Sequence, residues 1–209
     1  DGFAEFVYNG FKRKKMEDKK EEFLKIYDEH IRREGEAELR NYLLKSDFFK
    51  APASSRYHCA YEGGLCEHSV NTYKRLLKNV QNEYGADWEK TVSHETVAIC
   101  GLLHDLCKID FYKTDFRNVK ENGEWVRKPY YAREEALPYG HGEKSVYIVH
   151  SFIRLTREEA MAINWHMGGF DTRVRGGDGS VSEAYCKYHL AVLMHISDLQ
   201  ATFIDEKRG

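Results

Sequence analysis

Residues 97–108 read VAICGLLHDLCK and join an apolar run to an ionisable pair. By periodicity the run 97–103 fits a buried strand or a buried helix, but the segment 93–107 that contains it is long enough to favour a core helix. His104 and Asp105 end this helix. Burying such a pair is costly unless both groups are hydrogen-bonded or coordinate a metal. The stretch therefore predicts a helical core with a polar site at its edge.

Four other ionisable residues lie where a core residue or a helix end is expected. Asp198 lies in mid-helix within the otherwise uncharged run 188–199, where a carboxylate has no capping role. His68 shares a helix face with apolar neighbours, which points it inward. His141 begins one expected helix and His166 ends another. Any one of these histidines alone is more often a satisfied core or surface residue. Their combination and order along the chain favour a common site.

The composition is that of a globular protein. The chain has 209 residues, of which 42% are hydrophobic and 13% aromatic, and this excludes disordered, collagen-like and low-complexity classes. The net charge of -2 favours no particular partner. The longest stretch without Asp, Glu, Lys or Arg has 11 residues (160–170), against about 20 for a membrane span, so we expect no membrane segment. Five cysteines without a disulfide or zinc pattern, and no apolar signal segment, predict a cytoplasmic location.

Apolar periodicity and cap signals predict about seven helices. The expected ranges are 14–34, 36–46, 63–84, 93–107, 141–155, 156–166 and 182–205. Thr156 and Glu159 form a capping-box pattern at the start of one of them. The range 168–180 holds five glycines and is expected to be a mobile loop.

Residues 111–133 differ from the rest of the chain. Aromatic and β-branched residues alternate loosely with charges around Asn122-Gly123, the strongest short-range hairpin signal. The expected fold class is therefore all-α with one small β-hairpin. We expect one compact unit, with 1–56 as a helical extension packed on a domain of residues 57–209.

Three motifs carry a resemblance to a known family. They are HCAYEGGLCEHS (58–69), LLHDLCK (102–108) and GHGE (140–143). The order of His68, His104-Asp105 and Asp198 resembles the HD-domain superfamily of metal-dependent phosphohydrolases, an all-helical fold. The local motifs look most like the HD domains of YhaM-type 3′–5′ exoribonucleases.

This resemblance implies a site with two metal ions. His68, His104, Asp105 and Asp198 would hold the first, and the further histidines His141 and His166 would hold the second. Asp105 would bridge the two ions and is the main expected catalytic residue.

The mixed nitrogen and oxygen ligands bear on the metal. Imidazoles and carboxylates together suit Mn, Fe, Co, Ni or Zn, whereas Mg sites prefer oxygen ligands alone. Two such ions about 3.5–4 Å apart can clamp a phosphoryl group and lower the pKa of a bound water towards about 7. Phosphate ester hydrolysis is the chemistry that this implies.

Further residues are candidates for binding substrate. Lys108 could meet a phosphate oxygen as a second catalytic residue, or could simply complement a helix dipole. His58 could touch substrate or pack in its loop, and Arg173 and Arg175 could clamp phosphate or lie solvated. His195 precedes Asp198 by three residues, and we expect it to orient that carboxylate by a hydrogen bond instead of binding metal.

The leading hypothesis is a metal-dependent phosphohydrolase that cleaves a phosphomonoester or phosphodiester of a nucleotide or short nucleic acid. The alternative is a non-catalytic, metal-bearing regulatory or nucleic-acid-binding module. Expected partners are a phosphorylated small molecule or nucleotide. Net charges of +4 over 12–20 and +3 over 108–133 leave single-stranded nucleic acid open as a partner, while solvated surfaces explain them equally well. The oligomeric state is left open.

Overall fold

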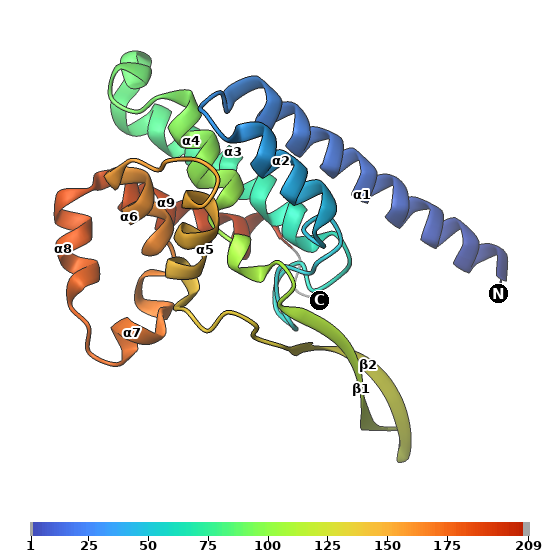
Figure 1. Ribbon diagram of the computed structural model, residues 1–209. Helices are drawn as coiled ribbons and strands as arrows, with labels where there is room; N and C mark the ends of the chain where they lie inside the picture. Colours follow the sequence, from blue (N-terminus) through green and yellow to red (C-terminus); the bar gives the residue numbers. More distant parts are fainter. Residues whose placement is uncertain (1, 207–209) are drawn as a thin grey trace.

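The computed structural model describes residues 2–206, with side chains from residue 14 onward. It confirms an all-α fold with one β-hairpin that extends from the helical body (Figure 1). The α-helices are α1 (Gly2–His30), α2 (Glu36–Lys45), α3 (Gly64–Tyr84), α4 (His94–Leu103), α5 (His141–His150), α6 (Arg157–Asn164), α7 (Thr172–Arg175), α8 (Ser180–Lys187) and α9 (His189–Gln200). Short turns of other helix types are η1 (Gly85–Lys90), η2 (Leu106–Lys108), η3 (Gly168–Phe170) and η4 (Ala201–Asp205).

The helix α4 lies at the centre of the core. Its residues from Val97 to Leu103 are all buried, as the apolar run predicts. Ser93 caps it by accepting a hydrogen bond from the backbone N–H of Thr96. The helix ends at Leu103, and Asp105 then leads into the short turn η2. The polar pair therefore lies where the central helix gives way to a tight turn.

The N-terminal helices share the core of α3 and α4. Phe23 and Tyr27 of α1, Ile31 directly after it, and Leu39 and Leu43 of α2 are all fully buried and belong to the same hydrophobic cluster as α4. The narrow apolar stripe of α1 is thus covered by the rest of the protein.

A buried ion pair fastens the turn after α1 to α6. The guanidinium of Arg33 donates to Glu159 over 2.8 Å and to Glu95 over 3.1 Å. Glu159 also forms the predicted capping box with Thr156, which confirms the start of α6. One carboxylate therefore serves both a helix cap and a contact between distant segments.

The hairpin has the predicted position and turn. Strands β1 (Tyr112–Glu121) and β2 (Glu124–Arg133) pair antiparallel, with Tyr112 opposite Arg133. Asn122 and Gly123 both have positive φ, 50° and 91°, as a two-residue hairpin turn of type I′ requires.

The C-terminal part differs from the expected single helix over 182–205. Tyr188 has extended backbone angles (φ -132°, ψ 90°) and separates α8 from α9. The α-helical hydrogen bonding of α9 then widens into the π-helical turn η4. The expected glycine-rich loop over 168–180 also contains the short helices η3 and α7. None of the described helices has an apolar stretch long enough to cross a bilayer.

The contact between α3 and α4 yields a prediction. A Cβ at Gly101 would lie 2.5 Å from the Cα of Tyr73, a backbone atom that cannot move aside. Gly101→Ala should therefore lower the free energy of unfolding by about 1–3 kcal/mol. Urea denaturation measures this, with Gly179→Ala as the control because a Cβ there meets nothing within 4 Å. Equal stability of the two variants would contradict this account of the contact.

Candidate metal centre

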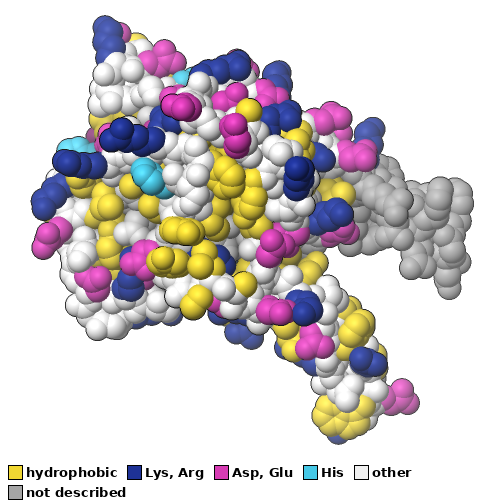
Figure 2. All heavy atoms as spheres, viewed as in Figure 1, with side chains coloured by type: hydrophobic (Ala, Val, Ile, Leu, Met, Phe, Trp, Pro, Cys, Tyr) yellow, Lys and Arg dark blue, Asp and Glu magenta, His cyan; other side chains and the backbone are white. Residues whose placement is uncertain are grey.

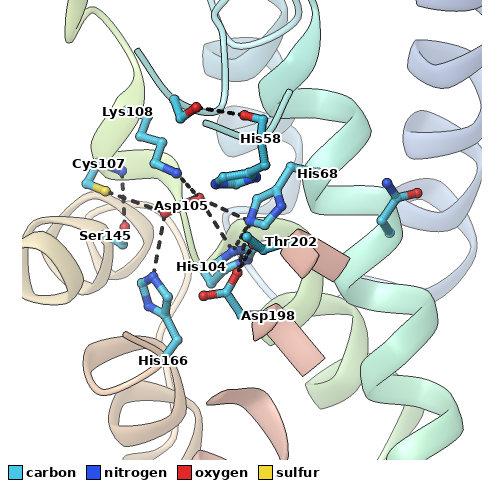
Figure 3. A network of polar contacts seen from close by, with 12 residues as sticks. His58, His68, His104, Asp105, Cys107, Lys108, Ser145, His166, Asp198 and Thr202 are labelled. Carbon is cyan, nitrogen blue, oxygen red and sulfur yellow. Dashed lines mark hydrogen bonds and ion pairs between the residues drawn. The ribbon is translucent and has the colours of Figure 1, made fainter. Parts of the chain in front are cut away.

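Six side chains that were predicted as metal ligands lie in one cluster, and all of them except His141 are labelled in Figure 3. They come from α3 and α9, from the start of α5, and from the residues that directly follow α4 and α6. His68 lies in the second turn of α3, His104 and Asp105 follow α4, and His141 begins α5. His166 follows α6, and Asp198 lies in α9. Residues up to 130 positions apart in the chain (68 to 198) thus meet in one buried region.

The carboxylate of Asp105 lies between two pairs of histidines. Its Oδ2 is 3.4 Å from His68 Nε2 and 3.6 Å from His104 Nε2. Its Oδ1 is 2.9 Å from His141 Nε2 and 3.6 Å from His166 Nε2. Each oxygen therefore faces a separate set of nitrogen donors. A carboxylate that spans two adjacent cation positions has this arrangement.

Asp198 completes the first of these sets. Its Oδ1 lies 3.2 Å from His68 Nε2, and the Nε2 atoms of His68 and His104 are also 3.2 Å apart. The side chains of all three residues are largely or fully buried.

Backbone carbonyls fix the orientation of two imidazoles. His104 Nδ1 donates to Gly101 O over 3.0 Å, and His166 Nδ1 donates to Ile163 O over 2.6 Å. Because a carbonyl oxygen only accepts, each Nδ1 carries a proton and each Nε2 faces the cluster. The Nε2 of His104 offers a lone pair, whereas Asp105 outweighs burial and raises the pKa of His166, so that metal binding there must displace a proton. The buried Nε2 of His166 has no hydrogen-bond partner among the described residues. A buried imidazole nitrogen that lacks a hydrogen-bond partner and lies beside other donors fits a divalent metal ion.

The local electrostatics keep two of the histidines neutral. Burial lowers the pKa of His104 to about 3 and also lowers that of His141, so both are in the neutral form that binds metals. Burial opposes protonation of His68 as well, but Glu206, Asp105 and Asp198 outweigh it and raise the pKa of His68 well above its usual value.

The two carboxylates of the cluster are ionised. Burial raises the pKa of Asp105, but Lys108 and the neighbouring imidazoles outweigh this effect and hold the pKa well below its usual range. The pKa of Asp198 is also low, since its contact with His68 outweighs burial. Two buried negative charges are therefore available to a cation.

Two residues of the site were missed in the sequence. The side chain of Glu206 is fully buried, and its carboxylate lies 2.6 Å from His58 Nδ1 and 3.0 Å from His68 Nδ1. The sequence shows it only as one charge in a charged C-terminal run. Cys107 Sγ lies 3.4 Å from His141 Nδ1 and 3.9 Å from Asp105 Oδ1. Burial raises the pKa of this thiol to about 12, so it is protonated.

The expected hydrogen bond of His195 to Asp198 is corrected by the structure. His195 Nδ1 instead donates to the backbone carbonyl of His166 over 2.6 Å. The side chain projects towards the turn after α6, where a Cβ on Gly168 would clash with its ring. His195 therefore supports the segment that carries His166.

The structure divides the four candidate substrate-binding residues into two that join the cluster and two that have other partners. Lys108 Nζ lies 2.6 Å from Asp105 Oδ2 within the cluster, and His58 joins the cluster through Glu206. Arg173 pairs with Asp171 and Glu143, and its guanidinium lies 4.1 Å from the ring centre of Trp165. Arg175 lies 5.8 Å from the ring centre of Phe170, outside the described cluster. The geometry thus favours Lys108 and His58 over the two arginines as groups beside the metal ligands.

Comparison with known proteins gives one informative similarity. Over 62 residues, 28% of this chain, the sequence is 37% identical to dihydroneopterin 2′,3′-cyclic phosphate phosphodiesterase of Methanocaldococcus jannaschii. The chain covers 23% of that relative's length. No family model and no solved structure matches. Together with the histidine and aspartate clusters, the similarity supports the resemblance to the HD superfamily.

The position of Asp105 predicts how metal content depends on it. After incubation with Mn²⁺ and gel filtration, Asp105→Asn should hold less than one ion per chain, since both histidine sets lose a shared carboxylate. Asp198→Asn should lower the metal content less, because Asp105, His141 and His166 remain intact in that variant. Elemental analysis gives the ratios, with the exposed Asp87→Asn as a control. Full metal content in Asp105→Asn would exclude a bridging role.

Proposed function

We propose that this protein is a metal-dependent phosphohydrolase that cleaves a phosphomonoester or phosphodiester of a nucleotide or short nucleic acid. The observation that carries the proposal is the position of Asp105, whose two oxygens face two separate histidine sets. The similarity to a protein named as a cyclic phosphate phosphodiesterase supports phosphate ester chemistry. The narrower resemblance to YhaM-type exoribonucleases rests on the quoted motifs alone and stays a prediction.

The proposed site takes two divalent transition metal ions per chain. His68, His104, Asp105 and Asp198 would hold one, and Asp105, His141 and His166 the other. Mn, Fe, Co, Ni or Zn suits these ligands better than Mg. When bound, such ions would polarise the phosphate ester and lower the pKa of the attacking water.

Lys108 places a positive charge beside the proposed metal ligands and does not itself bind metal. Its side chain is 10% exposed, and its ammonium contacts the same Asp105 oxygen that faces His68 and His104. Burial opposes its charge, but Asp105 outweighs this and raises the pKa of Lys108 above its usual value. A permanently charged donor in this position can stabilise the charge that grows on a phosphate oxygen.

His58 and Glu206 form a second polar pair beside the first metal set. Glu206 accepts from His58 Nδ1, which leaves the Nε2 atom of His58 as an acceptor. Burial lowers the pKa of His58, so the imidazole is neutral near pH 7. We propose that His58 binds the substrate or its attacking water by this lone pair, while Glu206 positions the ring.

A panel of phosphate esters separates this function from a non-catalytic metal-bearing module. Bis(p-nitrophenyl) phosphate, p-nitrophenyl phosphate and 2′,3′-cyclic nucleotides are tested with Mn²⁺, Ni²⁺, Co²⁺, Zn²⁺ and Mg²⁺. Hydrolysis that requires metal and is lost in Asp105→Asn is the expected result. A metal-loaded protein that hydrolyses none of these esters would favour a regulatory module.

The role of Lys108 gives a further prediction. Lys108→Ala should keep its metal but lose about 10²–10³ in kcat, because a preorganised charged donor is removed. Lys113→Ala is the control, since Lys113 is exposed and pairs with Glu134. kcat, metal content and melting temperature are measured together. An unchanged kcat with a stability loss of about 0.3–1 kcal/mol would show that Lys108 only complements a helix dipole.

A further inference from the structure

The β-hairpin formed by β1 and β2, here called the arm, has two chemically different faces. Successive residues of a strand point to opposite faces, and residues opposite each other in the register share a face. One face, here called the aromatic face, therefore carries every second residue of β1 from Tyr112 to Lys120 and their partners in β2, from Arg133 back to Trp125. Lys113, Ala132 and their alternates form the other, here called the mixed face.

The aromatic face carries rings and positive charge without any acid. Its four rings are Tyr112, Phe116, Trp125 and Tyr131. Its cations are Lys120, Arg127 and Arg133. All three carboxylates of the two strands, Asp115, Glu121 and Glu124, fall on the mixed face. The net charge of the segment is thus small, but all of its acids lie on the mixed face and none lies on the aromatic face.

The groups on the two faces also differ in their partners. On the mixed face Lys113 pairs with Glu134 and Lys128 with Glu121, whereas the third cation, Arg117, lies 5.2 Å from the ring centre of Tyr130. On the aromatic face no cation forms an ion pair with a described residue. The guanidinium of Arg127 instead lies 4.7 Å from the ring centre of Phe116. The cations of the aromatic face therefore remain available to an anionic partner.

The rings of the aromatic face are exposed along the outer part of the arm. Trp125 is 72% and Phe116 is 51% exposed, and hydrophobic side chains gather at the tip of the arm (Figure 2). A tryptophan this exposed adds little to stability, because burying its surface is what stabilises. Binding of an external partner would explain why these rings are exposed.

The inner end of the aromatic face lies next to the metal centre. Tyr112 begins β1 four residues after Lys108, whose ammonium contacts Asp105 over 2.6 Å, and the side chain of Tyr112 is half-buried. The rings of Tyr112 and Tyr131 are 6.3 Å apart. A ladder of rings and cations thus runs outward from the cluster along one face of the arm.

We propose that the aromatic face of the arm binds single-stranded nucleic acid and leads it towards the metal centre. Exposed bases stack on aromatic side chains whatever their sequence, and the cations contact the phosphates. A duplex hides the faces of its bases, and a protein partner of mixed charge gives no reason to exclude acids from one face alone. The direction towards the metal centre rests on the proposed function, whereas binding by the arm does not.

Stacking is tested at Trp125. Binding of a fluorescein-labelled 12-residue oligothymidine to the Asp105→Asn chain is followed by fluorescence anisotropy. Trp125→Ala should weaken binding at least about fivefold, the lower end for loss of one stacked base. Val126→Ala is the control, since Val126 is a neighbouring exposed apolar residue on the mixed face. Equal effects of the two substitutions would overturn the proposal.

Charge is tested by a pair of lysines on the outer half of the arm. Lys120→Glu on the aromatic face should weaken binding more than Lys128→Glu on the mixed face, although both change the net charge equally. Lys120→Glu should also flatten the dependence of affinity on salt. Equal losses, or binding of inorganic polyphosphate as tight as that of oligothymidine, would show a merely electrostatic surface and refute the stacking platform.

The outcomes also separate this proposal from the proposed function. If the wild-type chain hydrolyses bis(p-nitrophenyl) phosphate but does not bind oligothymidine, the arm proposal fails and the hydrolase stands. If the chain binds oligothymidine through Trp125 and Lys120 but hydrolyses no ester, the arm proposal stands and the hydrolase fails.

Discussion

The arrangement of the helices depends on the burial of one carboxylate, that of Asp105. Its side chain is only 2% exposed, and a buried charge is tolerated only with close partners. Those partners are Lys108 and four imidazoles that come from four different helices or helix ends. The helices must therefore converge on this point. The burial of Asp105 thus constrains the arrangement of the helices, and the helices in turn position the side chains around Asp105.

Such convergence needs helices that approach closely, and glycines beside the ligands allow it. Gly101 lets α4 approach the backbone of Tyr73, and its carbonyl accepts the Nδ1 proton of His104. Gly142, next to His141, lies where a Cβ would be 2.1 Å from the carbonyl oxygen of Asn164. The glycines thus allow the close contacts between helices, and Gly101 also orients the imidazole of His104.

Local patterns predicted the fold class, the central helix and the hairpin, because each depends on neighbours in the chain. The six ligand positions were predicted from ionisable residues at core positions together with a family resemblance. Glu206 was missed because its burial follows from the π-helical turn before it, which the sequence does not signal. The sequence likewise gives no signal for the break at Tyr188, and the bond of His195 to the His166 carbonyl joins residues that are 29 positions apart. Contacts between residues far apart in the chain were predicted only where ionisable residues at core positions and the family resemblance indicated them.

The arm is organised by the opposite principle to the metal centre. At Asp105 every charge has a close partner, and the loss of water on burial sets the geometry. On the aromatic face of the arm, Trp125 and Lys120 remain in water, and folding gains little from their chemical type. Stability therefore does not explain why acids are confined to one face. Recognition of a polyanion does, because a single carboxylate on the aromatic face would repel the phosphates that its cations attract.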